Sequence, residues 1–137
     1  MPARIAVEWL TMRSALLAVV LAAAALPGGS ASAEDATDTT ASKRAETLDG
    51  LVRIVGAQAG IVLYCRKLYT VDDAVSDGLS QTARRALEAA MGHRRAETAV
   101  AAEGRRVGEE IASLGADRWC ADQRDILNTD GVQVFLD

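Results

Sequence analysis

The stretch LDGLVRIVGAQAGIVLYC, residues 48–65, decides the fold of this chain. Its apolar side chains form two stripes, one of which follows the three-and-four spacing of a helix face and contains Leu48, Leu51, Val52, Val55, Ala59, Val62 and Leu63. The other stripe lies on the opposite side and contains Ile54, Ile61, Cys65 and Leu68. A helix that is apolar on two sides is usually buried between neighbours, so we expect a central helix over residues 43–69. A strand at residues 61–64 is the less favoured alternative, because helical spacing continues on both sides of that run.

Toward the C-terminus, the same spacing predicts further helices. They cover residues 79–91, 94–114 and 118–128. Asp72 and Asp73 are suited to cap a new turn that contains Gly78. Gly92 either separates the helices at residues 79–91 and 94–114 or kinks a single helix. Gly115 is a helix stop, and Asp117 is suited to cap the last helix.

Length and composition agree with a small helical domain. The 137 residues allow one domain, and an aromatic content of 4% is low for a β-sandwich or barrel. We therefore predict an all-α fold, a three- to four-helix bundle over residues 43–131. Residues 132–137 follow it as an apolar C-terminal tail with no clear partner. A net charge of −4 excludes a generally basic nucleic-acid-binding protein.

The N-terminus has the pattern of a secretory signal peptide. Arg4 and Arg13 precede an uninterrupted apolar run at residues 14–26, and Ala31-Ser32-Ala33 matches a signal-peptidase site. The run is about 13 residues long, too short to span a bilayer core, which needs about 20. We predict Sec-type export, cleavage after Ala33, and a periplasmic or secreted location with no stable membrane span in the mature chain. Retention of the segment as an anchor is the alternative.

Cleavage after residue 33 would change the length and the net charge of the chain. It removes two arginines and one glutamate, so the mature protein has 104 residues and a net charge of −5. Residues 34–42 show no periodicity and are expected to form a disordered leader. Cys65 and Cys120 are both retained, and two cysteines in an oxidising compartment allow one intramolecular pairing. We therefore predict a Cys65–Cys120 disulfide that ties the central helix to the last one.

Paired arginines offer one candidate binding surface. Arg94-Arg95 and Arg105-Arg106 are 11 residues apart, about three helical turns, which places them on one helix face. The functional interpretation is an anion-binding stripe. The alternative is a solvated face laced by ion pairs four residues apart, namely Arg84 with Glu88, Arg105 with Glu109 and Arg106 with Glu110.

Other features have a structural and a functional interpretation. Two G-x-x-x-G motifs, at residues 56–60 and 104–108, indicate either close helix packing or sites of weak helix propensity. Trp119 is expected to cover the disulfide in the core. The alternative is that Trp119 is exposed and binds a partner, together with the residues of the apolar tail: Val132, Val134, Phe135 and Leu136. His93, the single histidine, belongs to no nameable catalytic group, and we expect no cofactor and no metal site.

These observations favour an exported, non-catalytic helical protein that acts through contacts with another periplasmic protein, as an adaptor, inhibitor or accessory subunit. The layout of export signal, short helical domain and one disulfide across some 50 residues is similar to that of small acid-stress chaperones of the bacterial periplasm. The similarity covers architecture and no motif, so it implies no site residues. A stress chaperone that exposes apolar surface and an anion or small-ligand binder remain the two alternatives.

Overall fold

The computed structural model describes residues 32–137, with side chains from residue 37 onward. It contains four helices and one 3₁₀ turn: α1 (Ser32–Tyr64), η1 (Cys65–Lys67), α2 (Asp73–Met91), α3 (His93–Leu114) and α4 (Ala116–Thr129). The predicted all-α bundle is confirmed for this part of the chain. The alternative of a strand at residues 61–64 is wrong, because those residues lie in α1. The predicted signal peptide lies outside the described residues, except for its last two positions.

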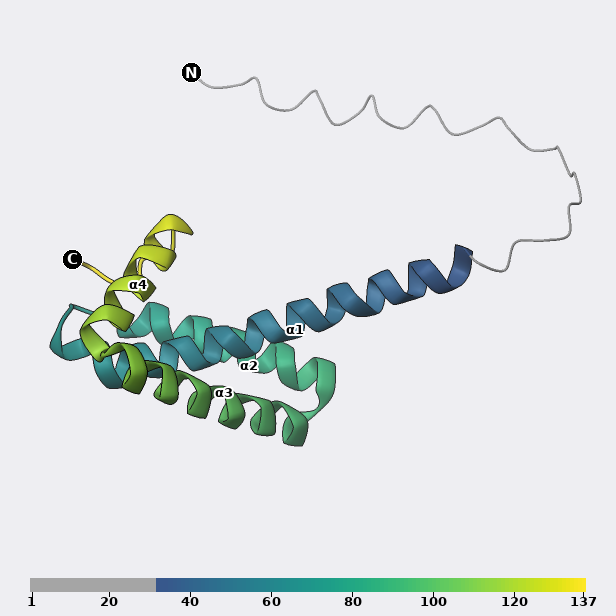
Figure 1. Cartoon of the computed structure of the whole chain (residues 1–137), viewed down its shortest axis with the longest axis horizontal. Helices are drawn as coiled ribbons and strands as arrows, with labels where there is room; N and C mark the ends of the chain where they lie inside the picture. Colours follow the sequence, from purple (N-terminus) through teal and green to yellow (C-terminus); the bar gives the residue numbers. More distant parts are fainter. Residues whose placement is uncertain (1–31) are drawn as a thin grey trace, which may run out of the picture.

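Helix α1 is the central element of the bundle. Figure 1 shows α1, α2 and α3 side by side, with α4 crossing them at one end. As predicted, α1 contacts all three of the other helices. The prediction that both of its apolar stripes are buried is wrong, because Leu63 is 70% exposed while Val55 and Ile61 are buried. The three neighbouring helices cover one broad side of α1 and leave a strip of it in solvent.

The ends of α1 differ from the prediction. The helix begins at Ser32, so residues 34–42 are helical and not the expected disordered leader. Side chains 37–47 are exposed, and this part projects beyond the other helices in Figure 1. It extends a helix that is already formed, in which each added residue gains a hydrogen bond. At the other end the α-helix stops at Tyr64 and the chain continues as η1. The Cys65 carbonyl there accepts from the backbone N–H groups of Leu68 and Tyr69, both at 2.9 Å.

Local signals explain most helix boundaries. The Asp72 carboxylate accepts from the backbone N–H groups of Ala74 and Val75 at 3.1 and 3.2 Å and caps α2. The expected helix start at residue 79 is wrong, because the turn that Asp72 caps continues directly into the helix from Asp73. Gly92, at φ +86°, separates two helices, which answers the question of a break or a kink. Gly115, at φ +87°, ends α3 as predicted but is also the N-cap of α4. Asp117 therefore lies in the first turn of α4 and is not its cap.

The buried side chains form two clusters at opposite ends of the bundle. The disulfide-end core consists of Ile61, Cys65, Val107, Ile111, Trp119, Cys120, Val134 and Phe135. The hairpin-end core, close to the turn between α2 and α3, consists of Val55, Ala83, Leu87 and Ala96. The first core is built from large and aromatic side chains, whereas the second relies on alanines that bring helices close together.

Candidate functional site

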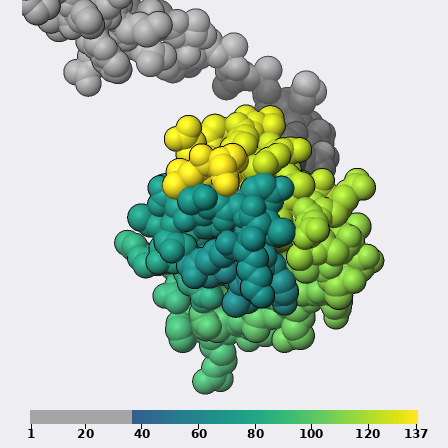
Figure 2. All heavy atoms as spheres, turned by 90° about the vertical axis from the view of Figure 1, so that its left-hand side faces the viewer, coloured from purple at the N-terminus to yellow at the C-terminus, as the bar shows by residue number. Residues whose placement is uncertain are grey.

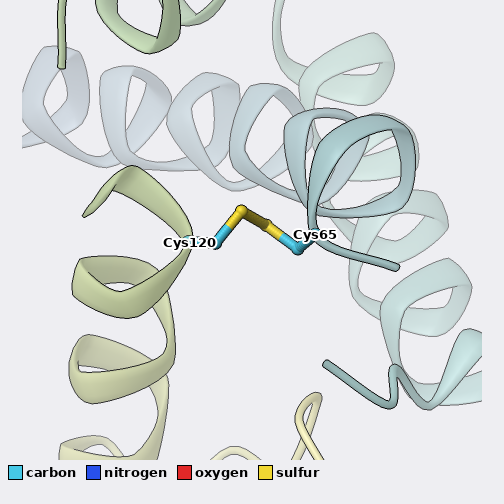
Figure 3. The surroundings of a disulfide bond; sticks show 2 residues. All are labelled: Cys65 and Cys120. Atoms are coloured by element: carbon cyan, nitrogen blue, oxygen red, sulfur yellow. A yellow bond between two sulfur atoms is a disulfide. The ribbon is translucent and has the colours of Figure 1, made fainter. Parts of the chain in front are cut away.

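The predicted disulfide is confirmed and defines one end of the molecule. Cys65 and Cys120 are bonded, with their Cα atoms 5.6 Å apart, and both are fully buried. Figure 3 shows that the bond links η1, directly after α1, to the first half of α4. It closes a loop across 55 residues, which in the chain-entropy model raises the free energy of unfolding by about 4 kcal/mol.

Trp119 lies in the core beside the disulfide. Its side chain is 2% exposed, so the prediction of a core residue is confirmed and the alternative of an exposed partner anchor is wrong. Gly60 makes room for it, since a Cβ added at Gly60 would lie 2.6 Å from Cη2 of the indole. Within the described part of the chain, the indole Nε1 has no hydrogen-bond partner.

The C-terminal tail also belongs to the core, which corrects the expectation that it lacks a partner. Val134 and Phe135 are buried and Val132 is half-buried, so these predicted partner-binding residues are largely covered. The tail pairs antiparallel with the segment before α2. The backbone N–H of Asp72 donates to the Val134 carbonyl at 2.8 Å, and that of Leu136 donates to the Thr70 carbonyl at 3.0 Å.

Aromatic contacts reinforce the tail. The ring of Phe135 meets that of Tyr69 edge to face, with centroids 5.5 Å apart. The guanidinium of Arg124 in α4 lies 4.8 Å from the centre of the same Tyr69 ring. The sequence could not reveal this arrangement, because it joins Tyr69 to residues 55 and 66 positions further along the chain, with which it shares no motif.

Exposed apolar side chains surround this covalently closed end. Of the seven large hydrophobic residues that are exposed between residues 37 and 137, six come from segments that meet here. We refer to these six residues together as the disulfide-end surface: Leu63, Tyr64, Leu68, Leu114, Ile126 and Leu136. Figure 2 looks onto this end, where η1, α4 and the tail lie beside one another. Leu136, at 60% exposure, is the one predicted partner-binding residue that remains accessible as a large side chain.

The four candidate anion-binding arginines lie on α3 but are not equivalent. Arg106 is held by Glu103, at 2.7 and 2.9 Å, and by Glu110 at 3.0 Å, and the hydrogen bonds to Glu103 raise its pKa. Arg94, Arg95 and Arg105 are exposed and form no ion pair with any described residue. The predicted pair between Arg105 and Glu109 is therefore not formed among the described residues.

The other predicted ion pairs are partly rearranged. The pair between Arg106 and Glu110 is confirmed. Arg84 reaches across to Glu97 of α3 at 2.8 Å and does not pair with Glu88 on its own helix. Glu88 instead lies 3.1 Å from Nδ1 of His93. Helical spacing could not predict these changed partners, because the contacts of Arg84 and Glu88 depend on how α2 and α3 face each other.

Polar groups separate the two cores along α1. Glu103, 9% exposed, packs over Gly56, where an added Cβ would overlap the Cγ atom of Glu103. The Ser76 hydroxyl donates to Oε1 of Gln58 at 2.8 Å in a buried hydrogen bond. Both carboxylate oxygens of Glu103 accept from Arg106, so its buried charge is neutralised.

Away from the disulfide end, three residues could hold a metal ion. The ligand atoms of Glu88, His93 and Glu97 lie within 4.8 Å of one another across the turn between α2 and α3. Sequence reasoning treated His93 as a lone histidine and missed its neighbours. The signal that could have found them is the spacing of His93 and Glu97, since residues four apart share a helix face.

No protein-family model, no curated protein and no solved structure matches this chain. Among the residues that the structure describes, one helical stretch, residues 37–67, is long and apolar enough to cross a bilayer by length and composition. The core helix of a bundle passes the same test, and α1 buries Val55, Ile61 and Cys65 against its neighbours.

Proposed function

We propose that this chain is exported and acts, without catalysis, by binding another exported protein through the disulfide-end surface. The observation that carries the proposal is the concentration of exposed apolar side chains at one end of the bundle. Single exposed hydrophobic residues are normal on a protein surface, whereas a concentration of them is typical of a contact surface. Leu63, Ile126 and Leu136 are each more than half exposed.

The way this end is built supports a binding role. The disulfide ties α4 to α1, and the tail is hydrogen-bonded to the segment before α2. Leu68, Ile126 and Leu136 are thus presented on backbone that is already ordered, so that this chain loses less conformational freedom when it binds a partner. A fitting partner has an apolar patch of its own with a polar rim, as protein interfaces usually have.

The disulfide and the signal-peptide pattern together support export. Disulfides persist in oxidising compartments and are rare in the cytosol. Mass spectrometry of the protein recovered from a periplasmic extract tests this part of the proposal. We expect a mature chain that begins at Glu34 with its two cysteines oxidised; recovery of the uncleaved, reduced chain from the cytoplasm would contradict it.

Site-specific photo-crosslinking tests the contact surface. A photoreactive residue in place of Ile126 or Leu136 is expected to capture the same protein, identified by mass spectrometry. The matched control places the photoreactive residue at Ala102, which is exposed on α3 away from this end. Equal capture from position 102, or different proteins from positions 126 and 136, would contradict a specific surface.

A second candidate function is anion binding by α3. It is supported by Arg94, Arg95 and Arg105, which are exposed and form no ion pair with the described residues. Charge reversal at Arg95 and Arg105 should weaken the binding of inorganic polyphosphate, measured by titration calorimetry. Charge reversal at Arg118, which lies on α4 and is paired with Asp122 at 3.7 Å, is the control. Binding that survives the first pair of changes would exclude this function.

A further inference from the structure

The turn between α2 and α3 brings together side chains that neither proposed function uses. Glu88 lies in the last turn of α2, His93 is the first residue of α3, and Glu97 is one turn further along α3. Their ligand atoms all lie within 4.8 Å of one another. We propose that Glu88, His93 and Glu97 form a binding site for a divalent transition-metal ion, with Zn²⁺ as the representative case.

The backbone places these three ligands without the help of a flexible loop. Gly92, at φ +86°, lets the chain reverse within one residue, so that α3 starts directly beside the end of α2. His93 and Glu97 are four residues apart and therefore share one face of α3. Two ligands thus come from α3 and one from α2, and an ion held there would link the two helices.

The distances suit a transition-metal ion. Zn–N and Zn–O bonds are about 2.0 to 2.2 Å long, so two atoms bound to the same ion lie roughly 3.0 to 4.2 Å apart. Nδ1 of His93 and Oε1 of Glu88 are separated by 3.1 Å, within this range. Glu97 completes the set by a side-chain rotation, for which it has room because the residue is exposed.

The donor chemistry selects the class of metal. One imidazole and two carboxylates suit Zn²⁺ and Cu²⁺, whereas Mg²⁺ and Ca²⁺ prefer oxygen ligands alone. The last turn of α2 contains no basic residue of its own, and its negative dipole end favours a cation. Arg44 of α1 already donates to the Ala90 carbonyl in that turn at 3.3 Å, so part of this effect is taken up. Arg84 is the competitor, because its Nη1 lies 2.8 Å from Oε1 of Glu97.

Calorimetric titration of the purified protein, prepared without a histidine tag, tests the site directly. ZnCl₂ is expected to bind with one-to-one stoichiometry and MgCl₂ is expected not to bind. His93→Ala and Glu97→Gln should each weaken Zn²⁺ binding roughly tenfold or more, since even second-shell losses cost 10- to 100-fold. Glu109→Gln is the matched control, as Glu109 is an exposed glutamate on α3 outside the cluster.

A second pair of variants tests the competition by Arg84. Arg84→Gln frees Glu97 and should tighten Zn²⁺ binding about two- to fivefold, the equivalent of one exposed ion pair. Arg85→Gln is the control, because Arg85 is exposed and contacts Gln81 but no carboxylate of the described residues. Unchanged Zn²⁺ affinity in His93→Ala, or an equal loss in Glu109→Gln, would overturn the site. Circular dichroism of each variant confirms that the helices remain formed.

Discussion

The two ends of the bundle are held together in different ways. At the disulfide end, a covalent bond, Trp119 and Phe135 bring together α1, α4 and the tail. At the hairpin end, Ala83 and Ala96 pack beside Leu87 and Val55, and one glycine reverses the chain. The difference indicates that large side chains and a cross-link are needed where distant segments must meet. Adjacent helices joined by a one-residue turn pack around a core of four buried residues, two of them alanines, without a cross-link or an aromatic side chain.

The two G-x-x-x-G motifs differ in the same way. A Cβ at Gly56 or Gly60 would collide with Glu103 or Trp119, so the first motif is a packing surface. At Gly104 and Gly108 no such neighbour lies within 4 Å, so the second motif lies in open space. One sequence pattern therefore has two structural meanings, and the difference depends on what the opposite helix presents.

The largest loss of stability is expected at the disulfide end, from removing the disulfide itself. Cys65→Ala combined with Cys120→Ala should lower the free energy of unfolding by about 4 kcal/mol, because the unfolded chain regains the freedom of a long loop. Urea unfolding measures the loss. Amide hydrogen exchange should accelerate more in α4 than in α2, and equal acceleration in both helices would show that the two ends are not independent.

The second-largest loss of stability is expected from emptying the core site that the C-terminal tail fills. Phe135→Ala should lower the free energy of unfolding by about 3 kcal/mol, since it empties a buried aromatic site. Leu136→Ala is the matched control and should change it by about 0.5 kcal/mol or less, because that side chain is largely in solvent. Urea unfolding of both variants measures the difference; similar small values would mean that the tail does not belong to the core.

Alanine substitutions in the two G-x-x-x-G motifs should change the free energy of unfolding in opposite directions. Gly60→Ala is expected to lower the free energy of unfolding by about 2 kcal/mol, because the added methyl forces the Trp119 ring to move. Gly104→Ala should raise it by up to about 1 kcal/mol, since alanine favours the helix and meets nothing. Thermal unfolding of the two variants measures both changes, and a loss in both would contradict the structural difference between the motifs.

The smallest effect is expected at Asp72, where the tail joins α2. Asp72→Ala removes the cap of α2 but keeps the backbone bond to Val134, and should lower the free energy of unfolding by about 1 kcal/mol. Asp77→Ala, an exposed position inside α2, is the control and should have little effect. Urea unfolding compares the two, and an effect as large as that of Phe135→Ala would mean that the tail detaches with the cap.

Sequence patterns predicted the elements well and the candidate site poorly. Helical spacing in residues 48–65 predicted the central helix, and Asp72 and Gly115 predicted helix ends, because these signals act over a few residues. Trp119 and the tail residue Phe135 were open to an interpretation as partner contacts, since hydrophobicity alone does not show whether a side chain is covered. The surface that supports a binding role instead consists mostly of residues such as Leu63, Leu114 and Ile126, whose exposure no local pattern revealed.

The sequence by itself determined the helices, whose apolar periodicity and caps are local, and the disulfide pairing, because only Cys65 and Cys120 are present. The tertiary structure alone decided which residues of each apolar stripe of α1 are covered, which glycine motif packs and where the tail lies. It also decided that Glu88 faces His93 and not Arg84. These outcomes depend on segments that are distant in the chain and meet only in the folded bundle. The local sequence around each residue does not indicate which distant residue it will contact.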